Sequence, residues 1–115
     1  MWMLRVVDAP AAIAARGFPE AVSLRVPLYI TDDARPANSG PWELAVADSR
    51  GALTRPGPAP LRGALDLGAR GLAALYAGTP LVTLRQAGLA RGGTPGADAA
   101  LDAAFAATPY MLDSF

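Results

Sequence analysis

A change of hydrophobic period near residue 68 limits the folds open to this 115-residue chain more than any other feature. Before it, apolar residues alternate with polar or small ones in residues 21–32 and 42–48, which is the period of half-buried strands. After it, residues 67–78 follow the i, i+3, i+4 spacing of an amphipathic helix. Strands followed by a run of helices predict an α+β fold, with about five mostly antiparallel strands packed against four to five short helices.

Several strands can be placed by their composition. Residues 2–8 are apolar and rich in β-formers, and residues 61–67 offer a further strand after a Pro/Gly-rich connection. Pro27 has no N–H to donate, so we expect its strand to lie at a sheet edge or to carry a bulge. The polar run 48–51 predicts a hairpin turn into a strand at residues 52–55.

The predicted helices carry start and stop signals. Asp8 is a suitable N-cap for a helix over residues 9–17, which Gly17 ends. Residues 79–88 and 94–107 both begin with Thr-Pro, where the hydroxyl can cap free amides and proline loses no hydrogen bond.

Four residues are of types often found in functional sites, but their sequence context indicates structural roles. We expect Tyr76 to contribute to packing and Trp42 to lie in the core. Asp32 and Asp33 precede a polar, Pro/Gly-containing run, which predicts turn formation.

Composition excludes several classes of chemistry. The sequence contains neither histidine nor cysteine, so Ser-His-Asp catalysis, a cysteine nucleophile, disulfides and thiolate metal sites are all excluded for this chain alone. Ten arginines balance ten acidic residues, which indicates no nucleic-acid-binding surface. No apolar run approaches the roughly 18–20 residues of a membrane span, and no basic segment precedes the first apolar run as in a signal peptide. A cytoplasmic location is therefore expected.

The length is that of one compact domain, residues 1–115. Because strand-like sequence begins at the second residue, we expect this domain to be part of a longer protein. Residues 108–115, Thr-Pro-Tyr-Met-Leu-Asp-Ser-Phe, are unusually apolar for a chain end. From the residues alone, the Phe115 ring could pack on the core, or its α-carboxylate could have a chemical role; packing is the favoured interpretation. Asp113 and Ser114 read as a solvated acid and a terminal hydroxyl.

The order of the apolar segments supports a resemblance to a known family. Residues 2–20, Trp-Met-Leu-Arg-Val-Val-Asp followed by a helix starting near Pro-Ala-Ala, look like the opening of the C-terminal domain of Eis-family (enhanced intracellular survival) GNAT acetyltransferases. Residues 22–33, 40–46 and 65–80, the last with its Leu-Tyr-Ala-Gly ending, agree with that family in the same order. The resemblance covers essentially the whole chain and implies a sterol carrier protein type 2 fold.

The resemblance also implies a function. Such a domain would follow GNAT regions that bind acetyl-CoA, so no cofactor is expected in this chain. The acceptor would be a small-molecule amine, such as an aminoglycoside, or a lysine. Partners would be the N-terminal GNAT regions and further copies, a hexamer in the family.

The same resemblance assigns residues at the chain end. It implies that the C-terminal carboxylate, here on Phe115, acts as general base on the acceptor amine, with Ser114 and Asp113 beside the acceptor pocket. An α-carboxyl group has an ordinary pKa of about 3.5, so this role needs burial, which raises the pKa of a carboxyl group.

Two other functions remain open at this level. A lipid- or sterol-binding module would hold its ligand between sheet and helices, and a structural domain would only mediate oligomerisation. Apolar helices serve all three functions, and a fold alone does not choose between them.

Overall fold

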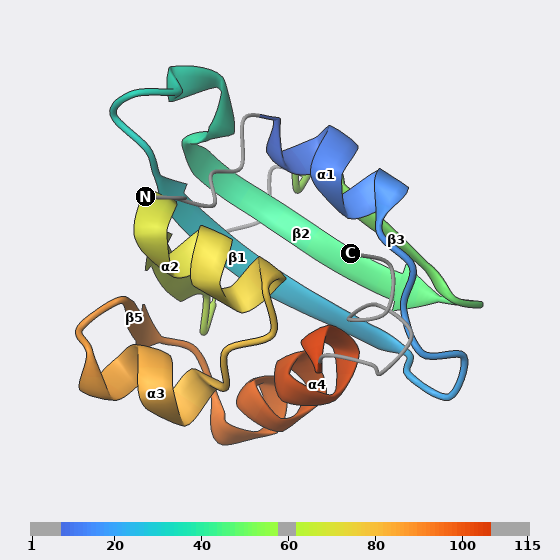
Figure 1. The fold of residues 1–115 in the computed structure, drawn as a ribbon. Helices are drawn as coiled ribbons and strands as arrows, with labels where there is room; N and C mark the ends of the chain where they lie inside the picture. The colour runs from blue at the N-terminus through green and yellow to red at the C-terminus, as the bar shows by residue number, and fades with distance from the viewer. Residues whose placement is uncertain (1–7, 58–61, 107–115) are drawn as a thin grey trace, which may run out of the picture.

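The computed structural model describes residues 8–57 and 62–106, which form one sheet with helices packed against it (Figure 1). Residues 2–7 of the predicted first strand and the candidate site residues 113–115 lie outside the described residues. The strands are β1 (Leu24–Thr31), β2 (Gly40–Ala47), β3 (Arg50–Thr54), β4 (Leu65–Gly68) and β5 (Ala90–Gly92). The helices are α1 (Ala9–Ala15), α2 (Ala69–Tyr76), α3 (Leu81–Gln86), α4 (Pro95–Phe105) and the 3₁₀ turn η1 (Pro36–Asn38).

The sheet order is β3-β2-β1-β4-β5. Neighbouring strands run antiparallel except for β1 and β4, which are parallel. The predicted α+β class, with mostly antiparallel strands and short helices, is confirmed. The short strand β5 was not predicted, because three residues that include a glycine show no measurable period.

The expectation that Pro27 lies on an edge strand is wrong, since β1 is the central strand of the sheet. Pro27 pairs with Glu43 of β2, whereas parallel pairing with β4 begins one residue later, at Leu28 and Leu65. The proline therefore sits where β1 has a neighbour on one side only. Although β1 is a central strand, Pro27 has no paired strand on its β4 side. The missing N–H is therefore tolerated, as it is on an edge strand.

The predicted hairpin between β2 and β3 is confirmed and its loop is two residues long. Ala47 pairs with Arg50, and the two residues between them, Asp48 and Ser49, have φ values of 53° and 67°. Positive φ at both central residues is typical of a type I′ turn, whose twist matches that of the strands.

The helices cover one face of the sheet, and the core lies between them (Figure 1). Alternate residues of β1 and β2 point into this core, and Trp42 is buried there as expected. The larger apolar side chains with at most 2% exposure that fill the centre are Leu28, Ile30, Leu44, Val46, Leu65, Leu67, Leu75, Leu81, Leu84, Leu101 and Phe105.

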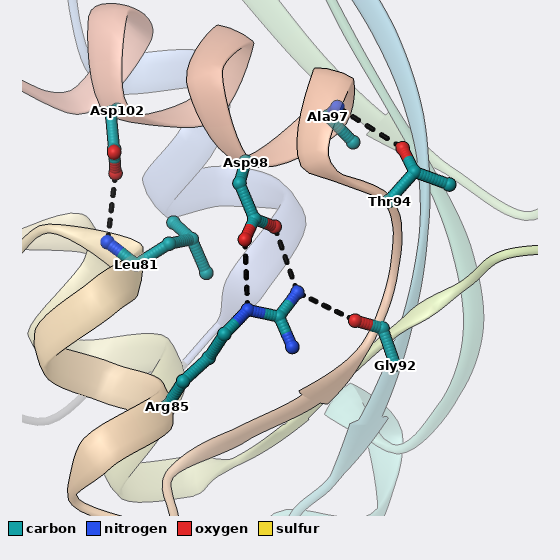
Figure 2. A network of polar contacts seen from close by, with 7 residues as sticks. All are labelled: Leu81, Arg85, Gly92, Thr94, Ala97, Asp98 and Asp102. Atoms are coloured by element: carbon teal, nitrogen blue, oxygen red, sulfur yellow. Dashed lines mark hydrogen bonds and ion pairs between the residues drawn. The ribbon is translucent and has the colours of Figure 1, made fainter.

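The start of α3 differs from the prediction. Thr79 does not cap it: the N-cap residue is Pro80, which has no capping side chain. The carboxylate of Asp102 on α4 instead accepts a hydrogen bond from the Leu81 amide at 2.8 Å (Figure 2). Thr94 does cap α4, as predicted, by accepting from the Ala97 amide at 3.1 Å.

A second polar contact joins α3 to α4. The Arg85 guanidinium donates to both carboxylate oxygens of Asp98 at 2.8 Å and to the Gly92 carbonyl (Figure 2). The hydrogen bonds to Asp98 raise the pKa of Arg85 above its ordinary value, so the guanidinium stays charged in any physiological buffer. This fork-like contact fixes the two short helices to each other and to the end of β5.

We expect Arg85→Met to lower the free energy of unfolding by about 1–2 kcal/mol, because it removes a two-pronged ion pair that is only partly exposed. Urea unfolding followed by circular dichroism measures the change. Arg70→Met, at an exposed position of α2, is the matched control and should shift stability by less than about 0.5 kcal/mol. Equal effects of the two variants would contradict the proposed strength of the Arg85–Asp98 contact.

Candidate functional site

The predicted site residues Phe115, Ser114 and Asp113 lie outside the described residues, so their roles stay predictions. The structure does describe the element that precedes them, since α4 ends at Phe105. The contacts around Phe105 therefore define how the chain is held where it leaves α4 towards the candidate site residues.

Three helices end around one buried arginine. Arg16 is the C-cap residue of α1, α2 ends at Tyr76 and α4 ends at Phe105. The Arg16 side chain donates from Nε to the Tyr76 carbonyl at 3.3 Å and from Nη2 to the Phe105 carbonyl at 3.3 Å. Its Nη1 donates to the Gly17 carbonyl at 3.1 Å. We call this group of contacts the Arg16 junction.

Aromatic rings enclose the same guanidinium. Its central carbon lies 4.9 Å from the ring centre of Phe105, 5.2 Å from that of Phe18 and 5.4 Å from that of Tyr76. Phe18 and Phe105 also meet edge to face, with ring centres 5.3 Å apart. A guanidinium that loses water is compensated here by ring faces and carbonyl oxygens, which explains how Arg16 can be only 7% exposed.

The charge of Arg16 suits this position. Each helix has a partial negative charge at its C-terminal end, where the last carbonyls find no partner within the helix. At the Arg16 junction one cation meets two such ends, those of α2 and α4, and also the Gly17 carbonyl just beyond α1. Tyr76 adds a further tie, because its hydroxyl donates to the Ala12 carbonyl of α1 at 3.2 Å. Its predicted packing role is confirmed.

Sequence reasoning missed Arg16. A signal was present, because a basic residue directly after a helix and before Gly17-Phe18 is well placed to reach C-terminal carbonyls. What the sequence could not show is that the carbonyls come from helices 60 and 89 residues further along the chain.

A hollow of about 430 Å³ opens at the carboxyl ends of the parallel strands β1 and β4, beside the start of α2. A smaller one of about 150 Å³ shares Thr31, Gly68, Gly88 and Leu89 with it. The charged residues of the two linings have both signs: Asp32, Asp33, Asp66, Arg70 and Arg91. This mixed lining does not fit the pyrophosphate of coenzyme A, which requires a concentration of amides and cations.

Asp32 lines that hollow, but acts as a turn former, as predicted. It is 2% exposed, and its carboxylate accepts hydrogen bonds from the Arg35 amide and from the Asn38 side chain at 3.5 Å. Its backbone amide donates to the Ser39 hydroxyl.

A third hollow of about 360 Å³ lies between the first half of β1 and the start of α4. The Gly-rich stretch before α4 contains β5, and Gly92 and Gly93 have positive φ. Thr94 already caps the helix, and Asp98 lies in its first turn, where a phosphate would meet a negative charge. The helix start at Thr94 is the one predicted from the sequence, and this stretch does not fit a phosphate.

Other ligand classes find little support among residues 8–57 and 62–106. The layer between sheet and helices, where a sterol would lie, is filled by the buried leucines of the core. No group of three acidic side chains that could hold a metal ion occurs in these ranges. None of the helices there is long and apolar enough to cross a bilayer.

Fold and contacts together define a small α+β domain in which a mixed sheet is covered on one face by helices whose ends meet at a buried cation. Residues 9–112 match the family described as sterol carrier protein domain. The chain belongs to that family.

Several solved structures are similar to this chain, and two of them are GCN5-related N-acetyltransferases. A GCN5-related N-acetyltransferase from Kribbella flavida is 53% identical over 90% of this chain, with a TM-score of 0.86. One from Anabaena variabilis ATCC 29413 is 30% identical over the same share, with a TM-score of 0.80. Eis1 from Mycobacterium abscessus is 28% identical, again over 90% of this chain, with a TM-score of 0.68. No protein with a curated description matches the chain in sequence.

This chain spans about a quarter of those proteins: 26% of the chains from Kribbella and Anabaena and 25% of Eis1. The resemblance to a domain of Eis-type acetyltransferases is confirmed.

Proposed function

We propose that this chain is the C-terminal domain of an acetyl-CoA-dependent GNAT N-acetyltransferase, to which it contributes the carboxylate of Phe115 and part of the acceptor pocket. The observation that carries the proposal is the 53% identity, at a TM-score of 0.86, to one quarter of a GCN5-related N-acetyltransferase. Its partners are the preceding GNAT regions of the same protein and, as an additional expectation, further copies of it.

The chemistry of the chain supports this assignment. Neither histidine nor cysteine is present, so a carboxylate is the natural base that this chain can offer. The hollows at the ends of β1 and beside α4 do not fit coenzyme A. A domain of this kind would supply acid–base and acceptor-binding groups while the acetyl donor binds elsewhere.

In the proposed reaction this chain moves one proton. A carboxylate oxygen of Phe115 takes it from the ammonium group of the acceptor, and the resulting free amine attacks the acetyl thioester. A C–N bond forms as the C–S bond breaks, and the leaving sulfur takes up the second proton that the nitrogen loses, which gives the amide and the CoA thiol. Asp113 attracts the cationic acceptor, and Ser114 lies beside it.

The test is deletion of Phe115 from the full-length acetyltransferase, assayed with kanamycin and with a lysine peptide as acceptors. We expect kcat to fall about 10²–10⁴-fold, the usual contribution of a general base, because the terminal carboxylate moves back by one residue. The KM for acetyl-CoA should change by less than about twofold, since the deletion removes no group that binds the acetyl donor.

Phe115→Leu is the matched control, because it keeps a carboxylate at the same position of the backbone and should keep most of kcat. Appending one glycine after Phe115 should mimic the deletion. Unchanged turnover after deletion would refute the role of the carboxylate, and failure to acetylate either acceptor would refute the proposed acceptor class.

A sterol- or lipid-binding module is the competing function, and the family description is its main support. Within the described residues the layer between sheet and helices is packed with the buried leucines of the core, which counts against this function.

A further inference from the structure

We infer that Arg16 is the positioning residue for the C-terminal segment: by holding the end of α4 against the ends of α1 and α2, it determines where the Phe115 carboxylate is delivered. This inference rests on the proposed function, in which that carboxylate accepts a proton. Arg16 itself touches no substrate in this proposal and acts only through the chain that follows Phe105.

The first argument is where Arg16 holds the chain. Its Nη2 donates to the carbonyl of Phe105, the last residue of α4, and its guanidinium lies 4.9 Å from the centre of the Phe105 ring. Both the backbone and the side chain of the residue at which α4 ends are thus fixed by one group. Phe105 is 2% exposed, so this end of α4 is also held by the core.

The second argument is that the Arg16 guanidinium, which holds the end of α4, is also hydrogen-bonded to two other backbone segments. The same guanidinium donates to the carbonyls of Tyr76 and Gly17, which end α2 and follow α1. A hydrogen bond from a flexible surface residue would leave the end of α4 free to tilt. A planar guanidinium that spans three backbone segments and stacks on three rings defines one orientation.

The third argument is the short connection. Only ten residues separate Phe105 from Phe115, so the end of α4 is the point from which the C-terminal segment starts. General-base catalysis requires heavy atoms within about 3 Å of each other, so a small shift of that starting point is expected to lower the rate of proton transfer.

The experiment is a double-mutant cycle in the full-length acetyltransferase. It uses Arg16→Met and deletion of Phe115, singly and together, with kanamycin and a lysine peptide as acceptors and release of the CoA thiol as the signal. We expect Arg16→Met to lower kcat about 10–100-fold, the scale of loss caused by a misplacement of about 1 Å or more, with little change in the KM for acetyl-CoA. In the variant that lacks Phe115, Arg16→Met should lower kcat by less than about twofold further, because the group that it positions is already gone.

Arg16→Lys keeps a cation among the rings but loses the planar fork. It is expected to fold and to lose kcat to a smaller extent, again only when Phe115 is present, so it decides the question if Arg16→Met does not fold. Tyr76→Phe is the structural control: it removes the hydroxyl contact to Ala12 but keeps the ring and the carbonyl that Arg16 contacts. Its melting temperature should fall slightly while kcat stays unchanged.

The outcomes separate the two proposals. If deletion of Phe115 lowers kcat but the effects of the two changes multiply in the double variant, Arg16 acts independently of the carboxylate and the inference fails. If Arg16→Met folds and leaves kcat unchanged, the inference fails as well. If deletion of Phe115 has no effect, the proposed role of the carboxylate fails, whatever Arg16 does.

Discussion

Replacement of Gly71 by alanine is expected to lower the free energy of unfolding by about 2–3 kcal/mol, although alanine is intrinsically a better helix former by about 1 kcal/mol. Gly71 is buried in the first turn of α2. An added Cβ would lie 2.3 Å from the backbone carbonyl oxygen of Leu89 and 3.3 Å from a methyl group of Leu67. A backbone oxygen cannot rotate away as a side chain does, so α2 or the chain before β5 must move.

Gly96→Ala is the matched control for this prediction. Gly96 also lies in the first turn of a helix, α4, but a Cβ added there would meet no atom within 4 Å. We expect this variant to be unchanged or up to about 1 kcal/mol more stable, from helix propensity. Urea unfolding of both proteins measures the difference, and a Gly71→Ala protein as stable as Gly96→Ala would contradict the close approach of α2 to Leu89.

Replacement of Asn38 by alanine is expected to cost about 2–3 kcal/mol, because it leaves buried polar groups without their partners. The Asn38 side chain accepts a hydrogen bond from the Ala9 amide at 2.9 Å and contacts the Asp32 carboxylate at 3.5 Å. Asn38 and Asp32 are each 2% exposed, and Ala9 is fully buried. The variant would thus loosen the start of α1 and the turn after β1 together.

Asp33→Ala provides the comparison, since Asp33 is an exposed residue of the same turn. Its effect should stay within about 0.5 kcal/mol. Hydrogen exchange adds a local readout: in Asn38→Ala, the amides at the start of α1 should exchange faster. If Asn38→Ala unfolds at the same urea concentration as Asp33→Ala, the buried contact to Ala9 contributes nothing to stability.

Local signals predicted much of this fold. The Asp-Ser turn and the Thr94 cap depend on residues near one another in sequence, and they could be predicted for that reason. The prediction that Pro27 lies on an edge strand was wrong because β1 is central, and only the position of Pro27 lacks a paired strand on one side. Whether β1 is an edge strand or a central strand depends on its pairing with β4, which lies almost forty residues further along the chain.

The site was less predictable than the fold. Thr79 carried the pattern of a cap, but the carboxylate that caps α3 belongs to Asp102 on another helix. Arg16 looked like one of ten similar arginines until the structure placed the ends of α2 and α4 around it. Contacts of this kind arise from the packing of helices, and no periodicity or motif encodes them.

The parallel pair in the sheet has a consequence for how the chain assembles. Strands β1, β2 and β3 follow one another, and the loop between β2 and β3 is only two residues long, so their contacts close with little loss of chain entropy. Leu28 of β1 meets its β4 partner only at Leu65, and β4 leads directly into α2. We therefore expect the β1–β3 contacts to form early and the β1–β4 pairing to form later, when β4 reaches the free side of β1 and brings in α2 and α4 of the Arg16 junction.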